Sequence, residues 1–182
     1  MVDSFTDLLL DARIRFIVIG GQAMVKVSGR ATDDVDVMVL SDDMDRLLSL
    51  LERYETKGLV KGLYLSRSGP SLYLRGRWIP THEEFDALDV GYFTDLDTET
   101  AFVWLIREFT DDRGGVTYAQ PSLVLYCRLI HGEWERYRDK ARADALLVGE
   151  VSEGWKVDAM KIANRLMDEP RAAELERRLQ EV

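Results

Sequence analysis

The pattern of hydrophobic and polar positions predicts alternating helices and strands in the first half of the chain. Residues 3–13 place apolar side chains at helical spacing behind Asp3 and Ser4, either of which could cap a helix. Residues 15–19 are β-branched and aromatic and end at a Gly-Gly pair, which predicts a strand and a tight turn. A second helix is expected from residue 22 onward. The first unit is therefore helix, strand, turn and helix.

The next segment combines β-branched residues with carboxylates. Residues 33–40 read Asp-Asp-Val-Asp-Val-Met-Val-Leu, which predicts a second strand whose acidic residues fall at its start. Ser41-Asp42-Asp43 then caps a helix that runs to about Tyr54. Further strands are expected at residues 60–66, 71–77 and 85–93.

After residue 95 the pattern becomes mainly helical. Gly114-Gly115 and Pro121 interrupt it. Helices are expected at residues 97–109, 121–137, 139–149, 155–167 and 170–181. The predicted fold class is therefore α/β (α+β), a small mixed sheet with flanking helices and a helical C-terminal extension. We expect residues 1–95 to form the α/β core and residues 96–182 to form a mainly helical part packed on it.

The composition is that of a globular protein with enough apolar material for a full core. The chain has 182 residues, of which 46% are hydrophobic and 31% are charged. Its 24 Lys and Arg residues against 33 Asp and Glu residues give a net charge of −9, the wrong sign for holding nucleic acid by general phosphate attraction. No Gly/Ser-rich linker divides the sequence into two independent domains.

Cysteine use and hydropathy bear on the cellular setting. Cys127 is the only cysteine, which excludes an intramolecular disulfide and a zinc site built from cysteines. The first residues lack the basic and apolar regions of a secretion signal, and no apolar stretch approaches the ~20 residues of a membrane span. We expect a cytoplasmic protein with no membrane partner.

Two glycines followed by two closely spaced carboxylates carry the candidate chemistry. Gly20 and Gly21 end the first strand, and a turn without side chains lets backbone N–H groups approach a phosphate. Asp34 and Asp36 lie two residues apart on the second strand, so they project together, about 6–7 Å apart along it. Like charges so close repel each other unless hard divalent cations lie between them. A triphosphate and its metal ions could share this cleft.

These residues resemble the minimal nucleotidyltransferases of the DNA polymerase β superfamily. The family pattern is a hydrophobic residue, Gly and Gly or Ser, a gap of about ten residues, and then Asp, hydrophobic, Asp or Glu, hydrophobic. Gly20-Gly21 and Asp34-Val35-Asp36 match it. The run from Arg30 through Thr32 to Asp36 also resembles the R-x-T-x-D-x-D form of the branch related to the AbiEii abortive-infection toxins. The resemblance implies nucleotide binding by both glycines, Arg30 and Thr32.

The same resemblance implies a third carboxylate on a later strand. Residues 85–92 offer Asp86 and Asp89. Asp89 is the better choice if Leu88, Val90 and Tyr92 form the buried face, because Asp89 then points to the opposite, polar face. We therefore expect Asp34, Asp36 and Asp89 to be the catalytic residues and the ligands of Mg²⁺ or Mn²⁺.

The later helices resemble the same branch less closely. Its helical signature often carries lysines and an R-x-K-D-x-x-D run. Here Arg128 stands where a lysine is common, and Ala141 follows Lys140 where an aspartate would be expected. By resemblance Lys140 reaches a triphosphate, although an exposed helix with i,i+4 charge pairs explains the run equally well.

The implied function is transfer of an NMP from an NTP to a hydroxyl or phosphate acceptor, with release of pyrophosphate. The alternative is a catalytically weak nucleotide-binding or interaction module, including one half of a toxin–antitoxin pair with an antitoxin as partner. The sequence leaves open whether the acceptor is RNA, protein or a small molecule. It also leaves open the choice of NTP.

Overall fold

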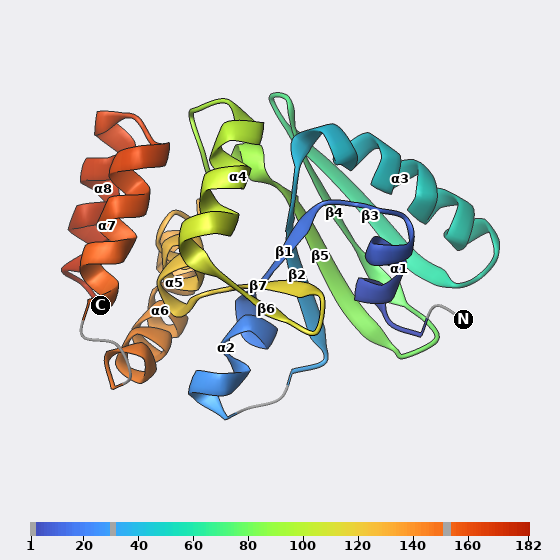
Figure 1. Ribbon diagram of the computed structural model, residues 1–182, viewed down its shortest axis with the longest axis horizontal. Helices are drawn as coiled ribbons and strands as arrows, with labels where there is room; N and C mark the ends of the chain where they lie inside the picture. The colour runs from blue at the N-terminus through green and yellow to red at the C-terminus, as the bar shows by residue number, and fades with distance from the viewer. Residues whose placement is uncertain (1–2, 30–31, 151–153) are drawn as a thin grey trace.

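A mixed seven-stranded sheet with helices on both faces organises the molecule (Figure 1). This computed structural model describes residues 3–29, 32–150 and 154–182. The strand order is β3-β4-β5-β2-β1-β7-β6, in which the pairs β2/β5 and β1/β7 are parallel and the other neighbours antiparallel. The strands are β1 (Phe16–Ile19), β2 (Asp34–Val39), β3 (Val60–Ser68), β4 (Ser71–Trp78), β5 (Glu83–Asp89), β6 (Thr110–Arg113) and β7 (Val116–Ala119).

Side-chain caps mark the start of some helices. Ser4 and Asp7 form a reciprocal capping box at the start of the first helix, and Asp168 accepts a hydrogen bond from the Arg171 N–H at the start of the last. The predicted cap of the helix after residue 40 is not formed, because Ser41 is already the first residue of that helix and Leu40 precedes it. The helices are α1 (Phe5–Asp11), α2 (Gly20–Ser28), α3 (Ser41–Thr56), α4 (Thr98–Phe109), α5 (Pro121–Leu129), α6 (Trp134–Gly149), α7 (Trp155–Leu166) and α8 (Glu169–Leu179), with one 3₁₀ turn, η1 (Val90–Tyr92).

Two hydrophobic cores lie on opposite faces of the sheet. Alternate residues of β2, Val35, Val37 and Val39, pack on the face covered by α1 and α3. Met38 and the apolar sides of α4 to α8 build the other core. Because successive strand residues point to opposite faces, this division fixes which side of the sheet each polar residue of β2 meets. The predicted mixed α/β fold is confirmed.

Three element boundaries differ from the prediction. The sheet does not end near residue 95, since the β6–β7 hairpin adds two strands beside β1, with Gly114 and Gly115 in the left-handed region at its turn. The expected helix over 121–137 ends at Leu129, and α6 begins only at Trp134, because Gly132 breaks the helical pattern between them. The expected strand over 85–93 ends at Asp89.

None of the helices within residues 3–29, 32–150 and 154–182 combines the length and the apolar character needed to cross a membrane.

Candidate active site

Asp34 and Asp36 lie on the same face of β2. Val35 and Val37 point into the core under α1 and α3, so both carboxylates point to the opposite side of the sheet. On that side α2 packs against β2 as well as against α5 and α6. α2 and the start of β2 lie on the lower side of Figure 1. The predicted common orientation of the two aspartates is confirmed.

Asp86 is the carboxylate that the sheet places next to Asp36. In the parallel pair β2/β5, Asp36 is the register partner of Asp86, and Asp34 is the partner of Glu84. Phe85 and Ala87 are buried in the core under α1 and α3, which turns Asp86 to the face that carries Asp36. The acidic residues Asp36 and Asp86 are therefore neighbours on adjacent strands.

The expectation that Asp89 is the third carboxylate of this cluster is wrong in the structure. Asp89 pairs with Val39, and its side chain is only 3% exposed on the opposite face from Asp36. It accepts hydrogen bonds from the Ser41 hydroxyl, the Gly91 N–H at 2.8 Å and the Leu72 N–H at 3.4 Å. These contacts connect Asp89 to the start of α3, the start of β4 and the turn η1, so Asp89 has a structural role.

The physical reason for this error is that the sheet is buried on both faces. The parity argument placed Asp89 opposite Leu88, Val90 and Tyr92, and these three do pack together on the core formed by α4 to α8. The opposite face is not polar, however, because it carries the second core, under α1 and α3. Within the strand itself, the pattern Phe85-Asp86-Ala87 carried the correct signal, an acid between two buried residues.

Gly20 is required by the closeness of Asp36. It has a φ of +67°, and a Cβ built on it would lie 1.8 Å from Oδ2 of Asp36. No other residue could occupy this position without displacing the carboxylate. Gly20 is also the first residue of α2, so Asp36 rests against the N-terminus of that helix. The glycine turn and the acidic strand are therefore in direct contact at Gly20 and Asp36.

Gly21 and Thr32 form the neighbouring contact. A Cβ on Gly21 would lie 2.9 Å from Cγ2 of Thr32, and the Thr32 hydroxyl oxygen accepts a hydrogen bond from the Asp34 N–H at 3.2 Å. The structure therefore brings both predicted glycines together with Thr32 and the two aspartates of β2. Arg30 lies outside the described residues.

The pKa of Asp36 depends on burial and on the charged residues around it. Burial raises the pKa of Asp36 above its usual value, and the negative charges of Asp86 and Asp34 raise it further. Arg128 and Lys140 act in the opposite direction and lower that pKa. Basic side chains from α5 and α6 are therefore close enough to act on the acidic residues of the sheet.

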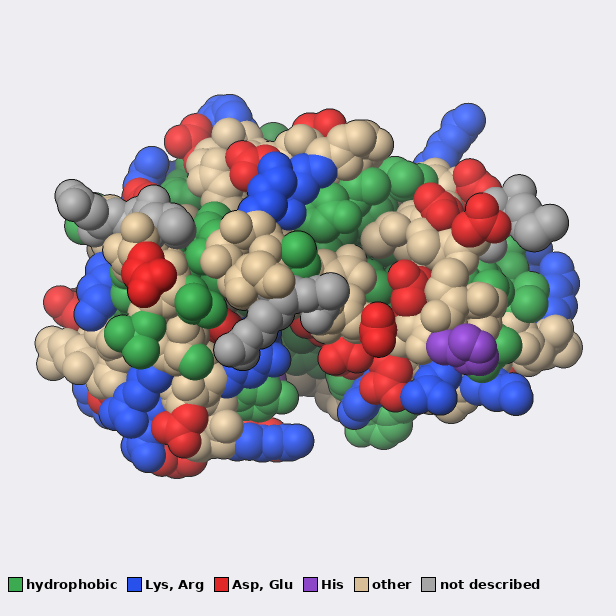
Figure 2. All heavy atoms as spheres, turned by 90° about the horizontal axis from the view of Figure 1, so that it is seen from below, with side chains coloured by type: hydrophobic (Ala, Val, Ile, Leu, Met, Phe, Trp, Pro, Cys, Tyr) green, Lys and Arg blue, Asp and Glu red, His purple; other side chains and the backbone are tan. Residues whose placement is uncertain are grey.

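Arg128 is a partly buried cation near these acidic residues. Its side chain is 14% exposed, and its Nε lies 3.5 Å from Oδ2 of Asp144 on α6 without making a hydrogen bond. Lys140 is exposed on the same helix as Asp144. Figure 2 shows the lower side of the molecule hollowed near its middle, with acidic side chains gathered beside the hollow.

Tyr73 and Arg75 of β4 continue the site beyond Asp86. The Tyr73 hydroxyl donates a hydrogen bond of 2.5 Å to Oδ1 of Asp86, and Arg75 Nε lies 3.8 Å from the same oxygen. Burial and then the Asp86 contact raise the pKa of Tyr73, so it remains a protonated donor. Sequence analysis missed both residues, because a partner on an adjacent strand has no fixed spacing in sequence.

Asp34, Asp36 and Asp86 have the ligand chemistry that a hard cation prefers, but they do not form a complete coordination shell. Carboxylate oxygens are the protein ligands that Mg²⁺ and Mn²⁺ prefer, and Asp34, Asp36 and Asp86 offer them from one face. In the described part of the chain, no three His, Cys, Asp or Glu side chains already surround one metal position. This arrangement fits a cation that takes the rest of its ligands from a substrate and from water.

Comparison with known proteins finds only distant structural similarity. The chain matches no family model and no curated protein sequence. Among solved structures it is similar to the crystal structure of a candidate nucleotidyltransferase from H. pylori, with a TM-score of 0.36 and 15% sequence identity over 93% of this chain and 86% of that one. The functional argument therefore rests on the geometry of the site.

Proposed function

We propose that the chain is a metal-dependent nucleotidyltransferase, which moves an NMP from an NTP to a hydroxyl or phosphate acceptor. The observation that carries this proposal is the position of Asp36, which lies against Gly20 at the N-terminus of α2 and beside Asp86 on β5. A glycine turn at a helix N-terminus and a pair of carboxylates are therefore neighbours. Their juxtaposition is what phosphoryl chemistry on a triphosphate needs.

The start of α2 and the basic residues of α5 and α6 would hold the triphosphate. Gly20 and Gly21 leave the backbone N–H groups at the N-terminus of α2 accessible to phosphate oxygens. Arg128 and Lys140, which already act on Asp36, would neutralise the phosphates from the opposite side. Thr32, packed on Gly21, would keep the turn in place.

Asp34, Asp36 and Asp86 would hold Mg²⁺ or Mn²⁺ on the face of the sheet. When bound, the divalent cation supplies charge stabilisation for the phosphates and lowers the pKa of an attacking hydroxyl. The three carboxylates would orient the cation, and its positive charge would relieve the repulsion that Asp34 and Asp86 exert on Asp36. Catalysis would consist of positioning and electrostatic stabilisation.

The reaction balances without a further reactant. The acceptor oxygen forms a bond to the α-phosphorus, and the bond from that phosphorus to the oxygen bridging to the β-phosphorus breaks. Pyrophosphate leaves with the electron pair of that bond. The proton of a hydroxyl acceptor would pass to a carboxylate of the site, Asp86 in this proposal, and from there to water.

The finer assignment to the AbiEii-related branch belongs to the proposal as well. It is supported by the described part of the R-x-T-x-D-x-D run, in which Thr32 and both aspartates lie together. Regulation by an antitoxin-like protein would follow from that assignment. Among RNA, protein and small molecules, the acceptor remains to be identified by experiment.

Incubation with each of the four α-labelled NTPs tests the proposal. The reactions contain Mg²⁺ or Mn²⁺ and, in separate tubes, total RNA, total protein or a small-molecule extract. We expect the wild type to transfer label to one acceptor class and Asp86→Asn to lose transfer by at least 10-fold. Asp42→Asn, which removes an exposed carboxylate on α3, is the matched control and should retain transfer.

Two outcomes would overturn the proposal in different ways. Nucleotide binding without pyrophosphate release would identify a binding module that has no transferase chemistry. Absence of both binding and transfer for all four NTPs would leave the fold without this function.

A further inference from the structure

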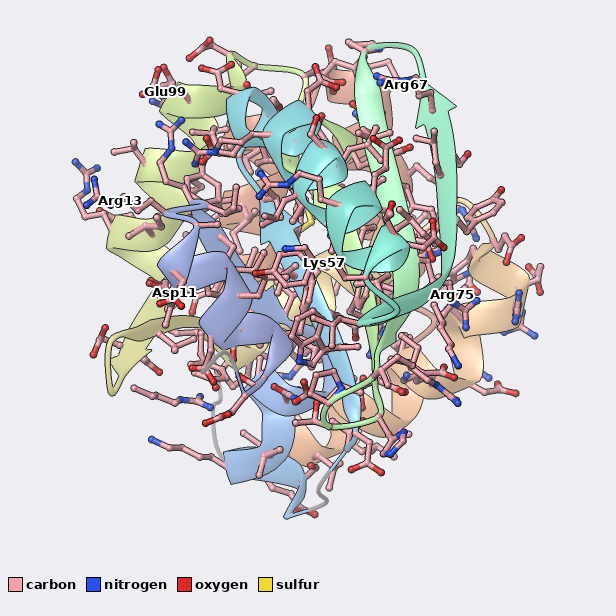
Figure 3. The ribbon with its side chains drawn as sticks, turned by 90° about the vertical axis from the view of Figure 1, so that its right-hand side faces the viewer. Asp11, Arg13, Lys57, Arg67, Arg75 and Glu99 are labelled. Carbon is pink, nitrogen blue, oxygen red and sulfur yellow. The ribbon has the colours of Figure 1, made fainter. Side chains whose placement is uncertain are left out.

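The carboxylate of Asp86 is held from the side opposite to Asp36. Across the sheet, Asp86 lies between its register partner Asp36 on β2 and its register partner Arg75 on β4. Directly paired residues on neighbouring strands share a face, so all three side chains project to the same side. Figure 3 shows Arg75 among the side chains that extend from the β3–β4 part of the sheet.

The Tyr73 hydroxyl reaches Asp86 along a diagonal of the sheet. Tyr73 lies directly opposite Leu88 in the β4/β5 pair. The Tyr73 hydroxyl nevertheless donates a hydrogen bond of 2.5 Å to Oδ1 of Asp86. Arg75 Nε approaches the same oxygen at 3.8 Å. Both donors of β4 therefore act on one oxygen of Asp86, which leaves the second oxygen outside these two contacts.

The position of Tyr73 is itself fixed by its surroundings. The adjacent residues Leu72 and Leu74 are buried, at 1% and 0% exposure, in the core on the other face of the sheet. The Leu72 N–H donates to the buried carboxylate of Asp89, which ties β4 to the end of β5 one residue before Tyr73. The Tyr73 ring also meets Tyr64 of β3 edge-on, with centroids 6.2 Å apart.

We propose that Tyr73 is a positioning residue, whose hydroxyl fixes the Asp86 side chain so that its second oxygen can share a divalent cation with Asp36. This inference rests on the proposed function and adds a residue to it. A carboxylate on an open sheet face has several rotamers, and a single strong donor selects among them. Partners of this kind, outside the ligands themselves, commonly change metal affinity or activity 10–100-fold when removed.

Tyr73→Phe isolates the hydroxyl, because it keeps the ring and its packing. Tyr64→Phe is the matched control on the neighbouring strand, where the ring is 56% exposed. We would measure Mn²⁺ binding by calorimetry in the presence of a non-hydrolysable NTP, then kcat and KM for nucleotide transfer, and the melting temperature of each protein. The expected result for Tyr73→Phe is 10-fold or greater loss of Mn²⁺ affinity and of kcat, with KM for the NTP within twofold of wild type.

The outcomes separate this inference from the proposed function. If wild type binds Mn²⁺ and transfers nucleotide but Tyr73→Phe has unchanged or tighter Mn²⁺ binding and unchanged kcat, the positioning role is contradicted and the function stands. Equal losses in both Tyr→Phe variants would also contradict it, because only Tyr73 contacts Asp86 in this pair. If wild type itself binds neither Mn²⁺ nor nucleotide, both proposals fail.

Discussion

Asp36 and Gly20 are in such close contact that a single added carbon on the glycine would lie 1.8 Å from the carboxylate oxygen. This contact joins the turn at the end of β1 to the acidic start of β2. The left-handed φ of Gly20 and the lack of space around it have separate energetic consequences. A pair of glycine substitutions separates these two effects.

Gly20→Ala should lower stability and disrupt the site, whereas Gly29→Ala should lower stability and leave the site intact. Both glycines have a positive φ, which costs an alanine roughly 1–2 kcal/mol, but a Cβ on Gly29 meets nothing within 4 Å. Chemical denaturation and nucleotide binding would be measured on both variants. Equal effects of the two substitutions on binding would show that the contact with Asp36 is not important.

Asp86→Asn and Asp89→Asn should separate activity from stability. Asp89 is buried and accepts three hydrogen bonds, so its replacement should cost about 1–3 kcal/mol of unfolding free energy. Asp86 is half-buried beside another carboxylate, and its replacement should leave stability nearly unchanged but remove transfer. Urea unfolding paired with the transfer assay checks both. The reversed pattern would restore Asp89 as the candidate ligand.

The ion pair of Asp43 should give stability that depends on pH. Burial alone would raise the pKa of Asp43, but hydrogen bonds from the backbone and side chain of Arg15 outweigh it and hold that pKa below its usual value. The unfolded chain therefore takes up the proton more readily. Stability from this pair is present above the ordinary aspartate pKa of about 4 and is lost as the pH falls through the lowered value of the folded protein.

Denaturation of wild type and Asp43→Asn between pH 2 and 7 measures this effect. We expect a difference in unfolding free energy of roughly 1–3 kcal/mol at pH 7, which shrinks below pH 4. Asp42→Asn, on the exposed side of the same helix, is the control and should show a small difference at every pH. A constant difference for Asp43→Asn would contradict the ionic origin of the effect.

Nucleotide should raise the melting temperature only when a divalent cation is present. A ligand that binds the folded state alone stabilises it by about 2.7 kcal/mol at a hundredfold excess over Kd. Without the cation, the triphosphate would meet the uncompensated charges of Asp34, Asp36 and Asp86. Thermal unfolding with each NTP, with and without Mg²⁺, provides the measurement. An equal rise in melting temperature in the presence of a chelator would show that the carboxylates do not contribute to nucleotide binding through a cation.

Local patterns in the sequence predicted much of the fold and part of the site. The alternation of β2 placed Asp34 and Asp36 on one face, because Val35 and Val37 between and after them are plainly apolar. The Gly-Gly turn was recognisable because it ends an apolar strand at once. These features are set by residues within a few positions of one another.

The remaining features depend on contacts between distant segments. Which carboxylate meets Asp36 depends on the register of β5 and on which of its two faces carries the site, and neither is fixed by spacing alone. The β6–β7 hairpin was missed because each strand has only four residues and β6, Thr-Asp-Asp-Arg, is polar. Tyr73 and Arg128 reach the acidic residues only through strand pairing and helix packing.

Parallel reactions with α-labelled and γ-labelled NTP test the central claim most directly, because they show which phosphorus bond is broken. Wild type, Asp36→Asn and the exposed-site control Asp42→Asn would each be incubated with Mg²⁺ and the acceptor preparation. The account predicts that wild type and Asp42→Asn transfer the α label and release the γ label as pyrophosphate, and that Asp36→Asn does neither. Transfer of the γ label to the acceptor, or undiminished α transfer by Asp36→Asn, would contradict it.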